Sequence, residues 1–269
     1  MIAIRRPDEI AKIGRSARIV GEALELAGGM VRPGVSTQEI NAEIERLIIA
    51  RGARPSFKGY HGFPASACIS VNDVVVHGIP SDRMLEEGDI VSIDVGAYLD
   101  GYHGDGAWTF PVGAISTDSQ RLMQVTREAL EVGIAQARPG QRLGEISHAV
   151  QSHVEDHGYS VVRMLVGHGI GSQLHEEPQV PNFGSRRQGP ILAAGMVLAI
   201  EPMVNAGGLD VYTAKDEWTV LTRDHSRSAH FEHTVAITAE GPQVLTLANG
   251  AVGAAGVSPH GARSAGERG

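Results

Sequence analysis

Two aspartates lie on either side of a turn in residues 88–110, which read GDIVSIDVGAYLDGYHGDGAWTF. The run at 90–95 is apolar and β-branched, which predicts a strand, and Asp94 is the charge that interrupts it. The Asp-Gly pair that follows is typical of a two-residue hairpin loop. Every register that such a loop permits places Asp94 and Asp105 on the same face of the hairpin, either directly opposite each other or diagonally.

Two carboxylates on one face of a hairpin repel each other and destabilise the strand pair. A divalent cation between them removes that repulsion, because hard cations collect carboxylate oxygens. The competing interpretation is that both aspartates are solvated on an exposed face. This pair alone leaves the two interpretations open.

An internal repeat favours the metal. Residues 22–34, EALELAGGMVRPG, match residues 128–140, EALEVGIAQARPG, at seven of thirteen positions. At a similar offset GDIVSID, which ends at Asp94, matches GMVLAIE, which ends at Glu201, and Glu232 stands where Asp105 stands in the first copy. A charge at the end of an apolar run is unfavourable unless it is paired or binds a metal, so two such placements argue against the solvated alternative.

The pattern along the chain predicts an α+β fold built from two related halves. Helical periodicity covers residues 10–30, and a capping box of Ser36 and Glu39 begins a helix that runs to residue 50. Strands are expected at 67–76, at 218–221 and, as the last clear strand, at 231–237. We expect one domain over 1–248, with pseudo-twofold helix–helix–β-hairpin halves at about 10–120 and 121–248 around a central antiparallel sheet, and ligands where the halves meet. Residues 249–269, rich in Gly and Ala, are expected to be a disordered tail.

Composition excludes several classes of function. The net charge is −8 and no basic stripe with interleaved aromatics occurs, which argues against direct nucleic-acid binding. Cys68 is the single cysteine, so an internal disulfide and a cysteine-based zinc site are excluded. The start, MIAIRRPDEI, lacks the apolar run of a signal peptide, and no stretch reaches transmembrane length. We therefore expect a cytoplasmic protein with no membrane partner, and nothing requires more than a monomer.

Five blocks of the sequence resemble the type I methionine aminopeptidases, which are pita-bread metallopeptidases of family M24. The blocks are VNDVVVHGIP, GDIVSIDVG, GHGIGSQLHEEPQVPNFG, IEPMVNAG and FEHTVAIT, and the resemblance extends over about residues 7–247 in the manner of the short bacterial form. It implies a pita-bread fold and five metal ligands: Asp94, Asp105, His168, Glu201 and Glu232. Two divalent ions (Co, Mn, Fe or Zn) would be held about 3.5–4 Å apart, bridged by Asp105 and Glu232.

The resemblance also implies a reaction, namely removal of the initiator methionine from nascent proteins and peptides with a small second residue by a metal-activated water. His175 would contact the scissile peptide, His77 would be the other active-site imidazole, and Glu201 would move a proton towards the leaving amine. Without the resemblance, a lone histidine is more often structural than catalytic. His175 is not part of an HExxH zinc helix, because Pro178 and Gln179 follow it.

The side chains that would hold the substrate are also known only through the resemblance, which implies a methionine pocket lined by Tyr60, Phe63, Cys68, Leu174 and Trp218, with Phe57 nearby. Considered alone, each of these is more often an ordinary core residue, and Cys68 is more plausible as a small apolar wall than as a nucleophile. The resemblance further implies a monovalent-cation site at Asn72, Val74 and Ser228.

Five positions depart from the family's common pattern. Phe63 stands where tyrosine is frequent, and Leu174 stands where an aromatic residue is frequent. Gly96 and Gly106 replace hydroxyl residues, and His230 stands where glutamine is frequent. These departures affect pocket width and the surroundings of the metal ligands rather than the ligands themselves.

Two alternatives remain at this level. The first is a proline-specific relative on the same fold, an aminopeptidase P or a prolidase, although those usually carry a further N-terminal domain. The second is a non-catalytic pita-bread binding protein, although such proteins lose metal ligands and this chain has all five. The main hypothesis also implies nascent-chain N-termini at the ribosome as partners.

Overall fold

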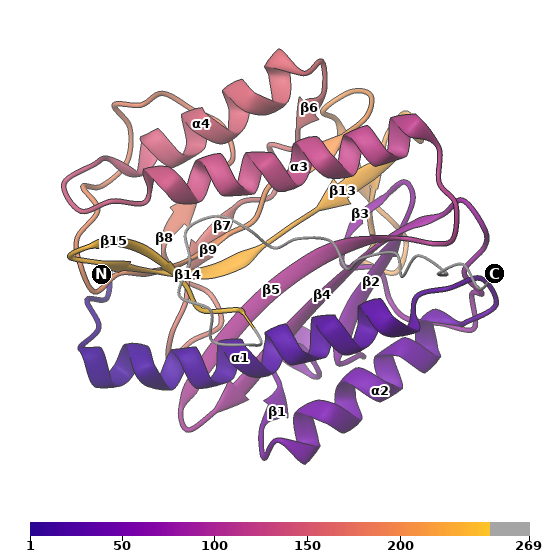
Figure 1. Cartoon of the computed structure of the whole chain (residues 1–269), viewed down its shortest axis with the longest axis horizontal. Helices are drawn as coiled ribbons and strands as arrows, with labels where there is room; N and C mark the ends of the chain where they lie inside the picture. The colour runs from indigo at the N-terminus through magenta and orange to yellow at the C-terminus, as the bar shows by residue number, and fades with distance from the viewer. Residues whose placement is uncertain (248–269) are drawn as a thin grey trace, which may run out of the picture.

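The computed structural model describes residues 1–247, so the predictions for residue 248 and for the tail at 249–269 lie outside the described residues. The fold is α+β, as predicted, and Figure 1 shows the strands between two pairs of helices, one pair above them and one pair below. The first half contains α1 (Pro7–Met30), α2 (Thr37–Ala50), β1 (Arg54–Pro55), a 3-10 turn (Tyr60–Gly62), β2 (Ala67–Val71), β3 (Val74–Val76), β4 (Ile90–Leu99) and β5 (Tyr102–Pro111).

The second half repeats this order with additional strands. It contains α3 (Thr117–Gln136), α4 (Leu143–Asp156), β6 (Ser160–Val161), β7 (Gly167–Gly169), β8 (Glu176–Val180), β9 (Val197–Ile200), β10 (Met203–Asn205), β11 (Val211–Thr213), β12 (Val220–Thr222), β13 (Ser228–His230), β14 (His233–Thr238) and β15 (Gly241–Val244). The pairs α1–α2 and α3–α4 are the two copies of the predicted helix pair.

The helices begin where the sequence supplies caps. Ser36 accepts a hydrogen bond from the backbone N–H of Glu39, and the Glu39 carboxylate accepts one from the Ser36 N–H at 2.7 Å. This capping box satisfies two donors that the first turn of α2 leaves free. The first helix begins at Pro7 with two acids in its first turn, a residue type that the helix dipole favours there.

Each half has its own main sheet. In the first half β4 pairs with β1, β2 and β5, and in the second the order is β15-β14-β9-β7-β8. All of these pairings are antiparallel. Two further sheets have three strands each, in the orders β13-β10-β6 and β11-β12-β3.

The two halves meet along a seam between β5 and the start of β14. The backbone N–H of Glu232 donates to the carbonyl of Ala107 at 2.8 Å. The Thr234 hydroxyl donates to the Asp105 carbonyl at 2.7 Å and accepts from the Asp105 N–H at 3.0 Å. Thr109 makes the corresponding pair of hydrogen bonds with the backbone of His230. The predicted site residues Asp105 and Glu232 are therefore positioned by the same hydrogen-bond ladder.

Two apolar cores lie beneath the two helix pairs. One is formed by first-half residues such as Val20, Ile44 and Ile93, and the other, apart from Ile90, by second-half residues such as Leu130. Trp108 on β5 packs against both cores, so the seam is apolar as well as hydrogen-bonded. Within residues 1–247, no helix is both long and apolar enough to cross a membrane.

Three strand predictions were wrong in their boundaries. The expected strand at 67–76 is two strands, because Asn72 adopts a positive φ of 57° between them. The strand expected at 218–221 begins only at Val220, since the Asp216 carboxylate accepts the N–H groups of Trp218 and Thr219 in a tight turn. The strand at 231–237 is not the last, because β15 follows it.

Candidate metal centre

The hairpin of β4 and β5 fixes the first two carboxylates. Leu99 pairs with Tyr102 across the predicted two-residue loop, and in the same register Asp94 lies opposite Ala107 while Asp105 lies opposite Gly96. The two aspartates are therefore diagonal neighbours on one face, which is one of the two arrangements that the loop length predicted. Diagonal neighbours lie within reach of each other's side chains.

The second half supplies two glutamates, each of which lies directly beside the end of a strand. Glu201 directly follows β9, and Asn182 donates its side-chain amide to the Glu201 carbonyl at 2.9 Å. Glu232 directly precedes β14 and is held by the seam. β9 and β14 are paired antiparallel, with Ile200 opposite His233. The two glutamates, one directly after β9 and one directly before β14, therefore lie at the same end of two adjacent strands.

The side chain of His168 on β7 is oriented by a hydrogen bond to the backbone of the next residue. Its Nδ1 donates to the Gly169 carbonyl at 2.9 Å, so Nε2 carries the free lone pair. Nε2 lies 3.5 Å from Glu201 Oε1 and 3.9 Å from Asp105 Oδ2. The strand must be very close to β8 here, because a Cβ at Gly169 would lie 2.3 Å from the Glu177 carbonyl oxygen. A histidine held by one nitrogen with the other free is typical of a metal ligand.

These residues fit a divalent metal by a test that is independent of resemblance. Asp94 Oδ1 and Glu232 Oε1 are buried and have no hydrogen-bond partner among residues 1–247. One ligand atom each from Asp105, His168 and Glu232 lies within 4.8 Å of the others, and Glu232 shares a second such group with Glu201. Buried carboxylate oxygens without partners are unfavourable in a folded protein, and a cation would satisfy them.

Burial controls the protonation of the four carboxylates when no metal neutralises them. It raises the pKa of Asp94 from 3.8 to about 7. Burial, followed by repulsion from the neighbouring carboxylates, raises the pKa values of Asp105 and Glu232 well above their usual range, and Glu201 behaves in the same way. The pKa of His168 falls to about 3 by burial, so its imidazole is neutral and able to ligate. A divalent ion would therefore replace protons when it binds.

His230 is a member of this group whose role the sequence did not predict. It lies at the end of β13, is 1% exposed, and its Nε2 has no hydrogen-bond partner in the part of the chain that the structure describes. That nitrogen lies 3.8 Å from Glu201 Oε2, and it belongs to the second group of ligand atoms with Glu201 and Glu232. The sequence signal was a histidine, in place of the more frequent glutamine, two residues before Glu232. From the sequence alone this histidine indicated only a departure from the family pattern and not a role in the site.

The two predicted active-site imidazoles lie closer to the surface. His175 is exposed, its Nδ1 hydrogen-bonds the Tyr60 hydroxyl at 2.7 Å, and its ring centre lies 4.2 Å from that of His168. His77 is partly buried, adopts a positive φ of 59°, and its ring centre lies 6.5 Å from that of Trp218. Burial lowers the pKa of His77, and packing of the inner part of the otherwise accessible His175 ring, with His61 nearby, lowers the pKa of His175, so both are neutral near pH 7.

The residues of the predicted methionine pocket belong to one apolar cluster. Phe63, Cys68 and Leu174 are buried in it, and Tyr60 and Trp218 pack against it as partly buried members. Phe63 and Trp218 contact each other edge to face, with ring centres 5.2 Å apart. The cluster adjoins the carboxylates, since Asp94, Asp105 and Glu232 are among the charges that act on the Cys68 thiol. Burial raises the pKa of Cys68, which keeps the thiol neutral and agrees with an apolar wall.

Two of the residues predicted for a monovalent cation lie together. The Ser228 N–H donates to the Asn72 carbonyl at 2.8 Å, while Val74 pairs with Leu221 in a neighbouring sheet. The Asn72 side-chain amide is already bound to Asp89 at 2.7 Å. The Asn72 carbonyl therefore already has a hydrogen-bond donor, and Val74 lies in a different sheet from Ser228.

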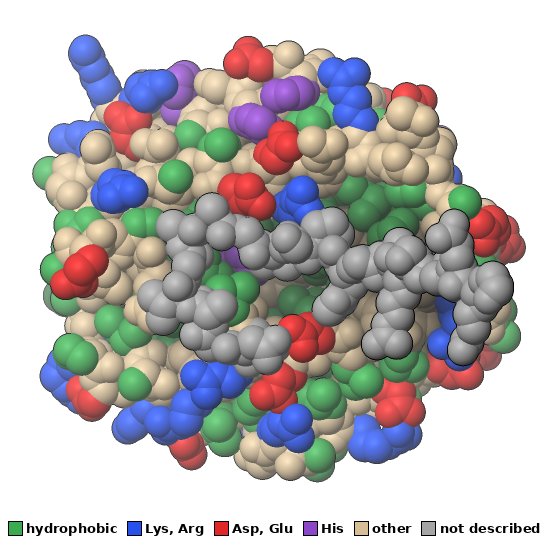
Figure 2. Space-filling model, in the orientation of Figure 1, with side chains coloured by type: hydrophobic (Ala, Val, Ile, Leu, Met, Phe, Trp, Pro, Cys, Tyr) green, Lys and Arg blue, Asp and Glu red, His purple; other side chains and the backbone are tan. Residues whose placement is uncertain are grey.

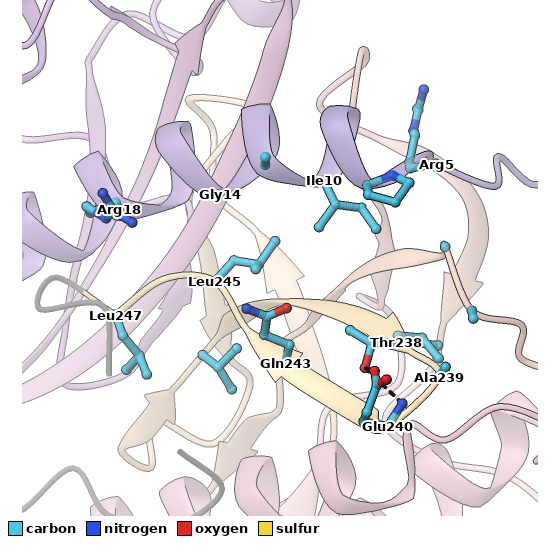
Figure 3. A pocket seen from close by; sticks show the side chains of 16 residues that line it. Arg5, Ile10, Gly14, Arg18, Thr238, Ala239, Glu240, Gln243, Leu245 and Leu247 are labelled. Atoms are coloured by element: carbon cyan, nitrogen blue, oxygen red, sulfur yellow. Dashed lines mark hydrogen bonds between the residues drawn. The ribbon is translucent and has the colours of Figure 1, made fainter. Parts of the chain in front are cut away.

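A large hollow lies elsewhere, between α1 and the β14–β15 hairpin (Figure 3). Its volume is about 710 Å³, and Ile10, Gly14 and Leu245 are among its lining residues. None of the residues that line it is a predicted ligand or pocket residue. The predicted metal ligands and pocket residues therefore lie at the carboxylate cluster and not at this hollow.

Comparison with known proteins agrees with this geometry. The sequence model of metallopeptidase family M24 matches residues 11–239. The chain is 53% identical to methionine aminopeptidase 1 of Bacillus subtilis over 91% of this chain and 99% of that protein. It is also similar to the crystal structure of methionine aminopeptidase from Rickettsia prowazekii, with a TM-score of 0.91, 43% identity, and coverage of 92% of this chain and 100% of that one. The similarity to prolidase from Pyrococcus furiosus is weaker, with a TM-score of 0.73, 28% identity, and coverage of 90% and 65%.

Proposed function

The chain belongs to metallopeptidase family M24 and, within it, to the methionine aminopeptidases, and from this premise we propose that it removes the initiator methionine from proteins and peptides with a small second residue. The observation that carries the proposal is the convergence of Asp105, His168, Glu201 and Glu232 from both halves on one buried place, with Asp94 beside Asp105 on the same face of the hairpin. That place adjoins an apolar cluster that could hold a thioether side chain.

The metal ligands would be these five side chains. Four carboxylates and one imidazole suit two hard or borderline divalent ions, and such a donor set does not select among Co, Mn, Fe and Zn. Ions held there would supply Lewis-acid stabilisation and an acidified water. The donors come from β4, β5, β7 and the ends of β9 and β14, so their positions depend on the assembled sheet rather than on flexible loops.

Three side chains would handle protons and the substrate backbone. Glu201, next to His168 and His230, is placed to accept a proton and to pass it to the leaving amine. His175 is neutral and exposed, so it can donate a hydrogen bond to the carbonyl of the scissile peptide. Its Nδ1 contact with the Tyr60 hydroxyl would orient the ring for that role. His77, whose ring centre lies 6.5 Å from that of Trp218, would contact the substrate chain.

The apolar cluster would determine which first residue is accepted. Phe63 and Trp218 present aromatic surface, and Cys68 and Leu174 complete a wall without charge. An unbranched thioether adapts to such a surface and makes favourable contacts with ring edges. Because Leu174 replaces a more usual aromatic residue, we expect the pocket to tolerate small variations in the first side chain.

The test is hydrolysis of Met-Ala-Ser by metal-stripped protein, titrated separately with Mn²⁺, Co²⁺, Fe²⁺ and Zn²⁺. We expect release of free methionine to return with at least one metal and to be absent from an Asp105→Ala variant. A folded protein that releases no methionine with any metal would contradict the proposal.

Two rivals define the remaining outcomes. Cleavage of Ala-Pro peptides in place of Met-Ala-Ser would indicate a proline-specific enzyme, the activity named for the prolidase that shares the fold. Binding of ribosomes or another partner without cleavage of any peptide would indicate a non-catalytic protein. The unpartnered carboxylate oxygens argue against the latter, since a binding protein gains nothing from them.

The cellular setting follows from the proposed reaction. The substrates would be nascent N-termini, met at the ribosome in the cytoplasm. Neither membrane nor nucleic acid is needed as a partner, and a monomer suffices because all proposed ligands lie in one chain. A monovalent cation at Asn72, Val74 and Ser228 would be a structural addition to this site.

A further inference from the structure

A second group of metal-ligating side chains lies on the outer helix pair. Glu128 on α3, His153 on α4 and His157, which directly follows α4, each offer one ligand atom, and these atoms all lie within 4.8 Å of one another. Figure 2 shows histidine and acidic side chains gathered over α3 and α4, on the outer face of the helix pair. The group shares no residue with the candidate metal centre.

The distances are close to those of a bound ion. His153 Nε2 lies 3.2 Å from Glu128 Oε2. Ligand atoms about 2.0–2.2 Å from a tetrahedral zinc ion are about 3.3–3.5 Å from each other. The rings of His153 and His157 are one helical turn apart with their centres separated by 4.5 Å, so a small rotation brings a nitrogen of each to one ion.

The free lone pair of His157 is set by a hydrogen bond. Its Nδ1 donates to the His153 carbonyl at 2.6 Å, because a carbonyl can only accept, and Nε2 is therefore the ligating nitrogen. Glu128 is oriented in a comparable way, since its Oε1 accepts from the Gln124 amide at 2.8 Å while Oε2 faces His153. Such outer hydrogen bonds hold ligands in the geometry that a metal requires.

The setting favours a cation and limits the motion of the ligands. His157 is the residue that caps the C-terminus of α4, where the helix dipole is negative. Ala129 and Leu130 of α3 and Val150 and Val154 of α4 are buried in the core directly beneath. The ligands therefore stand on packed helices, while the His153 and Glu128 side chains remain 20% and 32% exposed and open to solvent.

From this geometry we propose that Glu128, His153 and His157 form a separate site for one imidazole-preferring divalent ion, with zinc as the representative and water as the fourth ligand. Two imidazoles and one carboxylate suit Zn²⁺, Ni²⁺ or Cu²⁺, unlike the carboxylate-rich centre, which does not discriminate against Mn²⁺. Because Glu128 is on one helix and both histidines are on the other, a bound ion joins α3 to the end of α4. The ion thus has a structural role in the second half.

The test counts zinc. Full-length protein and a His153→Gln/His157→Gln variant are equilibrated with the same free Zn²⁺, and bound metal is measured by elemental analysis. We expect the variant to bind one ion per chain fewer than the unaltered protein, whatever the number in the carboxylate centre. Methionine release should be unchanged, because neither histidine touches that centre, so this test and that of the proposed function can fail separately.

A matched control is His225→Gln. His225 likewise contacts one carboxylate, that of Asp73 at 3.1 Å, but its side chain is more exposed than that of His153, and no second histidine lies three or four residues from it. We expect this variant to bind as much zinc as the unaltered protein. Equal zinc contents in all three proteins, or an equal loss in the control, would overturn the proposal.

A thermal measurement keeps the proposal testable if the double variant does not fold. The single variant Glu128→Gln retains the size and polarity of the side chain and removes only the negative ligand. In Zn²⁺ the unaltered protein should gain more in melting temperature than Glu128→Gln does, because an ion that binds only the folded state stabilises it. An identical gain in both proteins would contradict a ligand role for Glu128.

Discussion

The two halves of the fold place similar carboxylates on different supports. In the first half Asp94 and Asp105 lie within ten-residue strands of one hairpin, joined by a two-residue loop. In the second half Glu201 and Glu232 lie at the ends of β9 and β14, and the chain between them leaves the sheet for residues 202–231. The strand register therefore positions the two aspartates of the first half. In the second half, the hydrogen bonds of the seam position Glu232, and the Asn182 amide holds the backbone at Glu201.

The longer route of the second half adds what the first half lacks. Residues 202–231 carry Trp218 into the apolar cluster and His230 to within 3.8 Å of Glu201. The first half contributes two aspartates that the hairpin holds in place. The second half contributes two glutamates, whose side chains are longer, together with part of the apolar cluster proposed to bind the substrate. A duplicated fold can therefore keep the positions of its ligands while one copy gains the surface around them.

The largest expected effect tests whether the two supports are equally necessary. Asp105→Asn and Glu232→Gln each remove one negative ligand while preserving size. We expect each to lower kcat/KM for Met-Ala-Ser by at least the loss seen when one electrostatic stabiliser is removed, on the order of 10²–10³-fold. Steady-state assays at saturating Mn²⁺ measure this. A large loss in only one variant would show that the halves are not equivalent.

The next effect concerns how closely a helix approaches each half of the sheet. A Cβ at Gly104 on β5 would lie 2.4 Å from the backbone nitrogen of Ala17 in α1, whereas the corresponding position in the second half is the buried Phe231. We expect Gly104→Ala to lower the free energy of unfolding by about 1–3 kcal/mol, because backbone must shift.

The control for that prediction is Gly106→Ala, measured by the same urea titration. Its Cβ would meet the Val20 side chain at 3.1 Å, which a rotation can relieve. We expect it to be less destabilising than Gly104→Ala. Equal losses would mean that the close approach at Gly104 does not limit packing.

A third test addresses the residue that the second half adds. His230→Leu removes the nitrogen near Glu201, while His230→Gln restores a polar group of the kind that resembling enzymes often have there. We expect the leucine variant to lose about 10–100-fold in kcat/KM or in metal affinity, as for other groups that orient metal ligands, and the glutamine variant to lose less. If both variants match the unaltered protein, His230 contributes nothing to the centre.

The smallest expected effect is a pH dependence to which Asp94 of the first half contributes. The pKa of Asp94 is raised from 3.8 to about 7 in the metal-free protein. Its contribution to stability is therefore complete below pH 3.8 and is lost as the pH rises through 7. We expect added Mn²⁺ to raise the melting temperature more at pH 8 than at pH 6, because the ion then replaces fewer protons. Asp94→Asn should reduce this difference, and an unchanged difference would assign the effect to other groups.

The sequence was sufficient where a local rule determined the answer. The two-residue loop fixed the register of β4 and β5, and that register put Asp94 and Asp105 on one face. The capping box of Ser36 located the start of α2. The internal repeat identified Glu201 as a carboxylate counterpart because a short apolar strand precedes it, as one precedes Asp94.

The sequence was insufficient where distant segments meet. The seam at Thr234 and Ala107 joins residues from different halves, and no local pattern encodes such a pairing. His230 faces Glu201 only because β13 and the end of β9 converge, so its position is a property of the assembled fold. The strand ends near Asn72 and Trp218 were missed because side-chain hydrogen bonds and a positive φ, rather than hydrophobic periodicity, terminate them.

The seam has a consequence for how the protein could be divided. Only residues 112–116 connect β5 to α3, and most of them are exposed. A chain opened there would give two fragments, each with its own apolar core and half of the acids. Neither fragment alone could form the Thr234 and Glu232 hydrogen bonds to β5. Peptide hydrolysis by the mixed fragments would then report complementation, and the enzyme would act as a sensor of the encounter between its own halves.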